Sequence, residues 1–299
     1  MGISAWMGEA LEPSLLMSFL LVSLGAAAAA YDGFFNLTYY ILTIIGVTLT
    51  QNAVNVLNDY HDFKTGVDAR TIKTPFSGGS MFLVSGLIKP RSVFLFGMAS
   101  LLLALPIGVY FIILRGVVVI GIAVVAGVSV LLYTTTFARM CLGEFFAGLN
   151  LGPLVIYGAY YVQAVRLSFG TLAVGIAPGI MIAMVLYLNE LPDIEADASA
   201  GRKNLPILLG RKRAAELYAA IETFSILWIL ISVLAGMTPV TTLLALGGLP
   251  FALKSIQGAL RHYNDVEKLI PSLATNIATA YVTLTLLAVG YLLPIIMRM

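Results

Sequence analysis

The chain has 299 residues, of which 60% are hydrophobic and 11% are charged, with a formal net charge of +2. Soluble domains contain about 45–50% apolar and about 25% charged residues, so this composition excludes a soluble protein and predicts an integral membrane protein. The apolar runs are too long and too continuous for the alternating strands of a membrane barrel, so we expect an all-α bundle. The expected surroundings are the lipid bilayer, with no nucleic-acid partner.

Nine segments have about the 20 apolar residues that a helix needs to cross a bilayer. In chain order they are residues 14–31, 37–59, 92–114, 116–134, 142–163, 168–188, 214–235, 238–253 and 273–296. Gly247, Gly248 and Pro250 interrupt the eighth. We therefore predict about nine transmembrane helices in one domain that covers residues 1–299.

Lys and Arg are distributed unevenly between the two predicted membrane faces. One face receives the N-terminus and the loops after spans two, four, six and eight, and it carries all of the 17 Lys and Arg residues except Arg115, Arg166 and Arg298. Cytoplasmic loops are enriched in Lys and Arg. We therefore predict a multi-pass protein of the cell membrane whose basic face lies in the cytoplasm.

The second span ends in a stripe of amides and carboxylates. If this stretch is helical, its polar side chains recur at steps of three and four residues and share one face. They are Gln51, Asn55, Asn58, Asp59 and Asp62. His61 lies off the stripe, which favours a solvated residue over a ligand.

A long segment, residues 60–91, follows this motif. It contains several Gly and Pro residues and five basic residues, including Lys73. A loop of this length in a tight bundle is usually functional or disordered, and we interpret it as a lid. Its glycine-rich part, residues 76–80, either offers backbone N–H groups to phosphate or is a plain flexible turn.

Polar residues gather again between the fourth and fifth spans. Tyr133 and the threonines at 134–136 have the position of interfacial anchors. Arg139 and Glu144 are spaced awkwardly for a local helix pair. This leaves open that one or both face the same cavity as the acidic motif.

The sixth span ends in a second acidic motif. Asn189, Asp193 and Asp197 follow at i, i+4 and i+8, and Arg202 and Lys203 come shortly after them. Because this order repeats that of the first motif, we predict a duplicated four-helix unit, residues 14–134 and 142–253, followed by a ninth helix at 273–296.

Carboxylates grouped at a membrane need a cation, because each carries a desolvation cost of about 2.5–3.5 kcal/mol there. Oxygen ligands with almost no histidine favour Mg²⁺. One or two carboxylates and substrate phosphates typically hold this ion, so the two motifs predict a site for a diphosphate. The competing interpretation is that the acids and bases form ordinary ion pairs on the loop surface.

The motif Asn58-Asp-Tyr-His-Asp62, continuing to Gly66-Val-Asp68, resembles the first aspartate-rich motif of the UbiA superfamily of intramembrane prenyltransferases. The Asn189 to Asp197 motif resembles the second, and the likeness covers nearly the whole chain. It implies a bundle of nine helices around a central cavity, open to the cytoplasm, that binds a prenyl diphosphate with Mg²⁺ and transfers the prenyl group to an acceptor, commonly an aromatic ring. Gly66 stands where ubiquinone-type members carry a further aspartate, so the motif is most similar to the menaquinone-type branch, which prenylates 1,4-dihydroxy-2-naphthoate.

We assign site residues from the motifs and from this resemblance. The expected metal ligands are Asp59, Asp62, Asp68, Asp193 and Asp197. The expected diphosphate ligands are Asn58, Lys73, Asn189, Arg202 and Lys203. Catalytic roles are expected for Asp62, Asp193, Tyr133 and Arg139.

Two alternatives remain open. Within the family, the alternative is a prenyltransferase that acts on an ether lipid (geranylgeranylglyceryl phosphate) or on a chlorin. Outside it, a cation-coupled secondary transporter also duplicates its halves and places acids on broken helices. Here the acids stand at helix ends beside basic loops, which favours a diphosphate over a transported ion.

Overall fold

The computed structural model describes residues 13–68, 71, 73–76, 82–133, 136–199 and 201–298, and all regular structure within them is helical. The long elements are α2 (Pro13–Tyr31), α3 (Leu37–Thr65), α4 (Pro90–Arg115), α5 (Val117–Leu132), α8 (Phe169–Asn189), α11 (Arg211–Leu234), α12 (Leu249–His262) and α13 (Val266–Arg298). The shorter ones are η1 (Phe137–Arg139), α6 (Gly143–Leu149), η2 (Asn150–Leu154), α7 (Val155–Ala164), α9 (Ile194–Ser199), α10 (Leu205–Leu209) and η3 (Val240–Gly248).

The nine predicted spans are confirmed in the described part of the chain. Seven are long and apolar enough to cross a membrane, and α2 and α5 are shorter apolar helices. The fifth span consists of α6, η2 and α7, and the eighth consists of η3 and α12. The eighth span changes from 3₁₀ to α geometry at Gly248, inside the predicted interruption.

The second span is longer than expected, because α3 continues to Thr65 rather than ending at residue 59. It begins where the Asn36 side chain accepts a hydrogen bond from the Tyr39 N–H at 3.1 Å. It ends at Gly66, whose φ of 73° is in the left-handed region that glycine adopts without strain. The whole Asn58 to Asp62 motif is therefore helical, and its i, i+4 spacing puts these two side chains on one face.

Close backbone packing joins the fifth and sixth spans. Pro153 lies inside the π-helical segment η2, and proline lacks the N–H that a regular helix would use. Small residues face each other across the contact with α8, where a Cβ added to Gly148 would lie 2.6 Å from the Gly179 carbonyl oxygen. Glycine lets membrane helices approach this closely.

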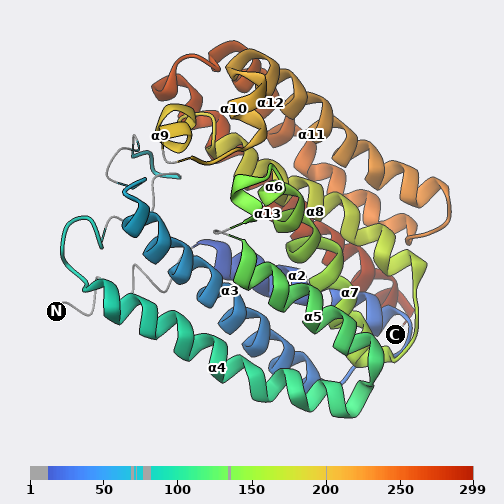
Figure 1. The fold of residues 1–299 in the computed structure, drawn as a ribbon. Helices are drawn as coiled ribbons and strands as arrows, with labels where there is room; N and C mark the ends of the chain where they lie inside the picture. Colours follow the sequence, from blue (N-terminus) through green and yellow to red (C-terminus); the bar gives the residue numbers. More distant parts are fainter. Residues whose placement is uncertain are drawn as a thin grey trace.

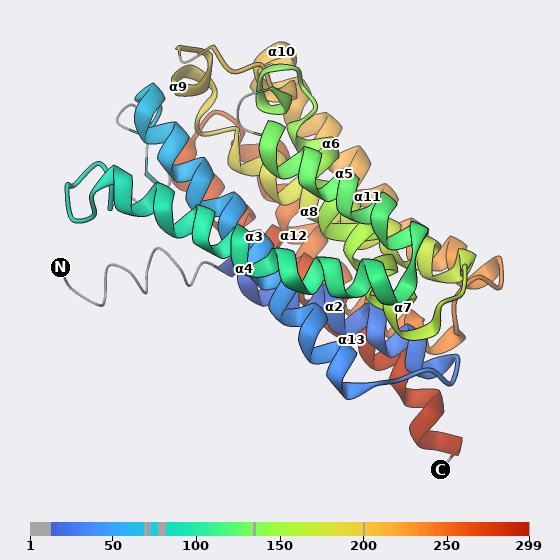
Figure 2. The ribbon, with the colours of Figure 1, turned by 60° about the horizontal axis from the view of Figure 1, so that its bottom comes forward.

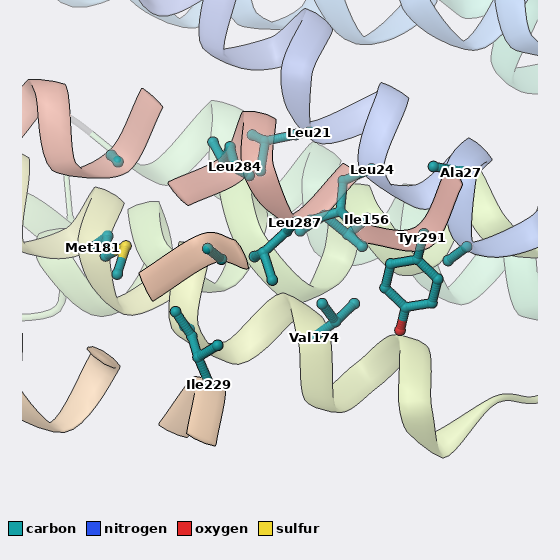
Figure 3. Close-up of a cluster of buried hydrophobic side chains, with 14 of the residues drawn as sticks. Leu21, Leu24, Ala27, Ile156, Val174, Met181, Ile229, Leu284, Leu287 and Tyr291 are labelled. Carbon is teal, nitrogen blue, oxygen red and sulfur yellow. The ribbon is translucent and has the colours of Figure 1, made fainter. Parts of the chain in front are cut away.

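The main apolar core lies between α2, α7, α8, α11 and α13. Figure 3 shows Leu24 of α2, Ile156 of α7, Val174 of α8 and Leu287 of α13 meeting there. Outside this core, α4 exposes large apolar side chains such as Leu103 and Ile113, as expected for a surface that faces lipid tails. The cavity described below lies between this core and the α3, α4 and α5 helices.

The two ends of the bundle differ in chemistry. Figures 1 and 2 show α9 beside the C-terminal end of α3, with α10 at the same end of the molecule and the C-terminus far from both. At the opposite end, Arg115 lies 4.6 Å from the Tyr39 ring centre, and Arg166 and Arg298 also lie over aromatic rings. Which end faces the cytoplasm remains a prediction from the distribution of basic residues.

Candidate active site

A cavity of about 830 Å³ is lined by residues of α3, α4, α5, the fifth span, α8 and α13. Its walls are polar near the C-terminal ends of α3 and α8, where Asn58, Asp59, Tyr133 and Asn189 line it. Farther along, most of the lining side chains are apolar, among them Phe111. The cavity therefore combines a polar mouth with an apolar interior, a shape that suits an amphipathic ligand.

The first acidic motif forms the α3 side of the mouth. Gln51 Nε2 donates to Asn55 Oδ1 at 2.9 Å, and Asn58 Nδ2 donates to Asp62 Oδ2 at 2.9 Å. Asp59 and Asp62 are both less than one tenth exposed. The stripe therefore faces the cavity or the neighbouring motif, as its spacing predicted.

The second motif reaches the mouth through a tight turn. Gly201 has a φ of 78°, and after it the Arg202 N–H returns to the Asp197 carbonyl oxygen at 3.0 Å. The Asp197 carboxylate is buried and accepts from Arg202 Nη1 at 3.0 Å and from Asn204 Nδ2 at 3.2 Å. Asn204 also caps α10 by accepting from the Ile207 N–H.

Arg202 joins the two motifs directly. Its Nη1 donates to Asp197, and its Nη2 donates to the carboxylate of Asp62, which lies 140 positions away in the sequence. The sequence predicted a common face for the two motifs, and the structure brings these residues into one cluster, which the Asn58 hydrogen bond to Asp62 joins to the cavity mouth.

Carboxylates are crowded in this cluster. Burial, with smaller contributions from Asp62 and Asp59, raises the pKa of the Asp68 carboxyl to about 7, and Asp193 acts in the same direction. Burial also raises the pKa of Asp197, although Arg202 opposes the rise. An added cation would therefore be stabilised here by several nearby negative charges.

The residues present fit Mg²⁺ together with a phosphate ligand. In the described ranges, no three His, Cys, Asp or Glu side chains converge closely enough to hold a metal by themselves. Mg²⁺ is usually bound by one or two carboxylates with waters and substrate phosphates rather than by an all-protein cage. Asp62 and Asp197 are the carboxylates that already share a cation, the Arg202 guanidinium.

Part of the predicted lid lies against the mouth. Lys73, Thr74, Pro75, Phe76 and Phe82 line the cavity. The glycine-rich residues 77–80, Arg70 and the threonines at 134 and 135 are outside the described residues. Closure of this segment over a ligand remains a prediction.

The sequence matches the UbiA prenyltransferase family model over residues 18–270. The chain belongs to the UbiA prenyltransferase family. It is 26% identical over 271 residues to the 1,4-dihydroxy-2-naphthoate octaprenyltransferase of Bacillus subtilis, covering 88% of this chain and 84% of that protein. It is 25% identical to the enzyme of the same name from Escherichia coli, covering 97% and 95%.

Solved structures of UbiA homologues share the fold. An apo homologue from Aeropyrum pernix K1 superposes with a TM-score of 0.70 at 17% identity, covering 93% of this chain and 98% of that one. A homologue from Archaeoglobus fulgidus, bound to DMAPP and Mg²⁺, superposes with a TM-score of 0.60 at 17% identity, covering 90% and 96%. The resemblance seen in the motifs is thus confirmed as family membership.

Two residues that we expected at the site of this UbiA-family protein are exposed and do not line the cavity. After α5 the chain turns into η1, where Phe137 points inward and stacks on Phe146 with ring centres 3.9 Å apart. Arg139, two positions later, is exposed and is not among the cavity-lining residues. Lys203 is also exposed, and its backbone pairs with Ala138 and Cys141.

Glu144 does not line the cavity either. Its Oε1 accepts from the Leu205 N–H at 3.2 Å, so this buried carboxylate holds the start of α10 against α6. Neither Arg139 nor Glu144 is among the residues that line this cavity, and a role for either one beside the acidic motifs stays a prediction. Together, Glu144 and the Lys203 backbone fix the second motif relative to the fifth span.

Several residues that shape the cavity were not predicted as site residues. Asn150 lines it and donates to Ser129 Oγ at 2.9 Å, which ties η2 to α5. An amide within an apolar span was the available signal. Phe111 and Gly108 of α4 also line it, and no periodic pattern distinguished them from their apolar neighbours.

Proposed function

We propose that this UbiA-family prenyltransferase transfers a prenyl group from a prenyl diphosphate to an aromatic acceptor of the quinone-precursor type, with Mg²⁺, and releases diphosphate. The observation that carries the proposal is the Arg202 bridge between Asp62 and Asp197, which Asn58 joins to the polar mouth of an apolar cavity by its hydrogen bond to Asp62. A diphosphate needs cations and a polar mouth, and an isoprenoid tail needs an apolar interior.

The diphosphate would be held at the mouth. Asp62, Asp193 and Asp197 would bind Mg²⁺, supported by Asp59 and Asp68, and when bound the ion supplies charge stabilisation for the departing diphosphate. Asn58 and Asn189 would orient the diphosphate through their amides. Lys73 and Arg202 would neutralise its remaining oxygens.

The reaction proceeds by breaking the C–O bond of the allylic diphosphate, and the bonding electron pair leaves with the diphosphate. An electron-rich ring carbon of the acceptor then bonds to the allylic cation, and its proton is released at the polar mouth, where carboxylates and diphosphate can accept it. Tyr133 lines the cavity beside the mouth, where its ring face would stabilise the cation. Apolar walls exclude water, which would otherwise capture the cation.

An aromatic acceptor is supported by the relatives. The Bacillus subtilis and Escherichia coli proteins carry the name 1,4-dihydroxy-2-naphthoate octaprenyltransferase, and they align with most of this chain. We further propose that the mouth faces the cytoplasm of the cell, in line with the basic loops at that end. The duplicated halves, residues 14–134 and 142–253, belong to the same proposal.

The test is an assay of the purified protein in lipid nanodiscs. A labelled prenyl diphosphate is offered with a dihydroxynaphthoate, a hydroxybenzoate, a glyceryl phosphate lipid or a chlorin. We expect a prenylated dihydroxynaphthoate that forms with Mg²⁺ and disappears with a chelator. Product on the glyceryl phosphate or the chlorin alone would overturn the aromatic quinone-precursor assignment, and cation flux without any prenylated product would overturn the transferase.

A further inference from the structure

The cavity is long as well as apolar. Along α3 its lining runs from Asp59 at the mouth to Thr43, and along α5 it runs from Tyr133 to Val119. At a rise of 1.5 Å per residue these stretches of helix are about 24 Å and about 21 Å long. Two helices on different walls therefore give similar lengths for a tunnel that leads away from the acidic cluster.

Buried and stacked side chains lie at the far end of the tunnel. Phe111 and Val119 are buried and line the cavity there. The Phe111 and Tyr39 rings pack edge to face with their centres 6.0 Å apart. The Arg115 guanidinium lies over the Tyr39 ring, 4.6 Å from its centre. Phe111 is therefore held in place from behind, so a tail that reaches it meets a supported wall.

The tunnel stays open just before this wall because a side chain is missing. Gly108 lines the cavity one helical turn before Phe111, and a Cβ added to it would meet no atom of the described residues within 4 Å. Gly46, on the neighbouring helix α3, also lines the cavity, and a Cβ added to it would lie 3.2 Å from Cγ2 of Ile107, the residue before Gly108. A larger residue at 108 would project into the space that the tail needs.

We propose that Gly108 and Phe111 set the length of the isoprenoid that this protein accepts, at four to five isoprene units. Three extended backbone bonds span about 3.3–3.6 Å, so the four main-chain bonds of an isoprene unit span about 4.4–4.8 Å. The tunnel then holds about four to five units from the mouth to Phe111.

By the same measure an octaprenyl chain, the group named for the Bacillus subtilis relative, is about 35–38 Å long and exceeds the tunnel. This inference rests on the proposed function and deepens it.

The test compares kcat/KM for prenyl diphosphates of two, four, five and eight units, with one acceptor held constant. In the wild type, we expect the highest value at four or five units and a fall of at least about tenfold at eight, because a tail that meets Phe111 must either keep methylenes in water or hold its diphosphate away from the acidic cluster. Gly108→Leu should lower the values for four and five units at least tenfold and keep the two-unit substrate within about threefold. Phe111→Ala should raise the value for eight units.

Gly121→Leu is the matched control, because a Cβ at Gly121 also meets nothing within 4 Å but this residue does not line the cavity. Its chain-length profile should equal that of the wild type. A wild-type profile that stays flat up to eight units would mean that the tail leaves sideways into lipid, and it would overturn the inference. The inference would also be overturned if Gly108→Leu and Phe111→Ala both transferred the two-unit group and kept the chain-length profile of the wild type. Absence of transfer from every diphosphate in the wild type would instead overturn the proposed function.

Discussion

Arg202 and Asp62 form an ion pair across 140 positions of sequence, and through it the turn after the second acidic motif is anchored to the first. The same guanidinium binds Asp197, so one cation compensates two buried carboxylates. Removing one partner of a buried ion pair is strongly destabilising because the other charge stays buried without compensation. The bridge therefore contributes to holding α3 and α9 together before any metal ion binds.

The first prediction concerns this bridge. Arg202→Gln should lower the stability of the metal-free protein by about 3 kcal/mol, since Asp62 and Asp197 lose their shared cation. Mg²⁺ should restore part of the loss by compensating the same carboxylates. Thermal unfolding with and without Mg²⁺ measures both effects. Lys268→Ala is the control, because its ion pair with Asp265 is exposed and should contribute nothing measurable; equal unfolding temperatures for both variants would refute the bridge.

The second prediction concerns the metal ligands. Asp62→Ala and Asp193→Ala should each lower turnover by about 10²–10³-fold, the usual effect of losing one electrostatic stabiliser. The double variant should be little worse, because residues that act as a unit are not additive. His61→Ala should remain within a fewfold of wild type, since His61 packs edge to face on Tyr60. An equally sensitive His61 would contradict the assignment of the stripe.

The third prediction separates two lysines that the sequence grouped together. Lys73 lines the cavity mouth, whereas Lys203 is exposed and pairs only through its backbone in the contacts described. Lys73→Ala should weaken diphosphate binding several-fold and leave acceptor affinity unchanged, and Lys203→Ala should change neither. Isothermal titration with inorganic diphosphate and Mg²⁺ measures this. Limited proteolysis tests the lid, because a closed lid should protect residues 60–91 from protease when inorganic diphosphate and Mg²⁺ are present. Equal cleavage with and without these ligands would exclude the lid.

The fourth prediction addresses the contact of α8 with the fifth span. A Cβ on Gly179 would lie 2.7 Å from the Gly148 carbonyl oxygen and 2.8 Å from Pro153 Cδ. Gly179→Ala should therefore destabilise the protein by about 1–3 kcal/mol through overpacking. Gly127→Ala, where a Cβ meets nothing within 4 Å, should be neutral or slightly stabilising because alanine favours helix. Reversible unfolding in mixed detergent micelles compares them, and an equal effect would rule out the close contact.

The fifth prediction concerns Glu222 of α11. It is 0% exposed, and neither carboxyl oxygen has a hydrogen-bond partner among the described residues. Burying a polar group without partners costs about 1–3 kcal/mol on protein mutational scales, so Glu222→Met should raise stability by a similar amount. Glu216→Met, at an exposed position of the same helix, should change it little. A loss of stability in Glu222→Met, measured by the same unfolding assay, would mean that this carboxyl makes an important polar contact.

The sequence by itself determined the helices and the spacing of the two acidic motifs. Transmembrane helices are decided locally, because every backbone polar group must be satisfied within the segment and about 20 apolar residues suffice. The acidic stripe was equally local, since the helical period alone places Asn58 and Asp62 on one face. The predicted span ended at residue 59, six residues before α3 ends at Thr65, because charged residues do not stop a helix that continues beyond the bilayer. The lone polar residue Asn276 of α13 donates to the Met184 carbonyl oxygen of α8 at 2.9 Å and so joins two helices.

Only the tertiary structure decided which side chains meet. Nothing local to Arg202 indicates Asp62 as its partner, because their contact depends on how α9 packs against the end of α3. The outward position of Arg139 follows from the stacking of Phe137 on Phe146, a contact between two elements. Likewise, Gly108 and Phe111 become the end of a tunnel only because α3, α5 and α7 surround them. Hydrophobic burial selects apolar residues without specifying their neighbours, so the packing of the helices determines the shape of the cavity.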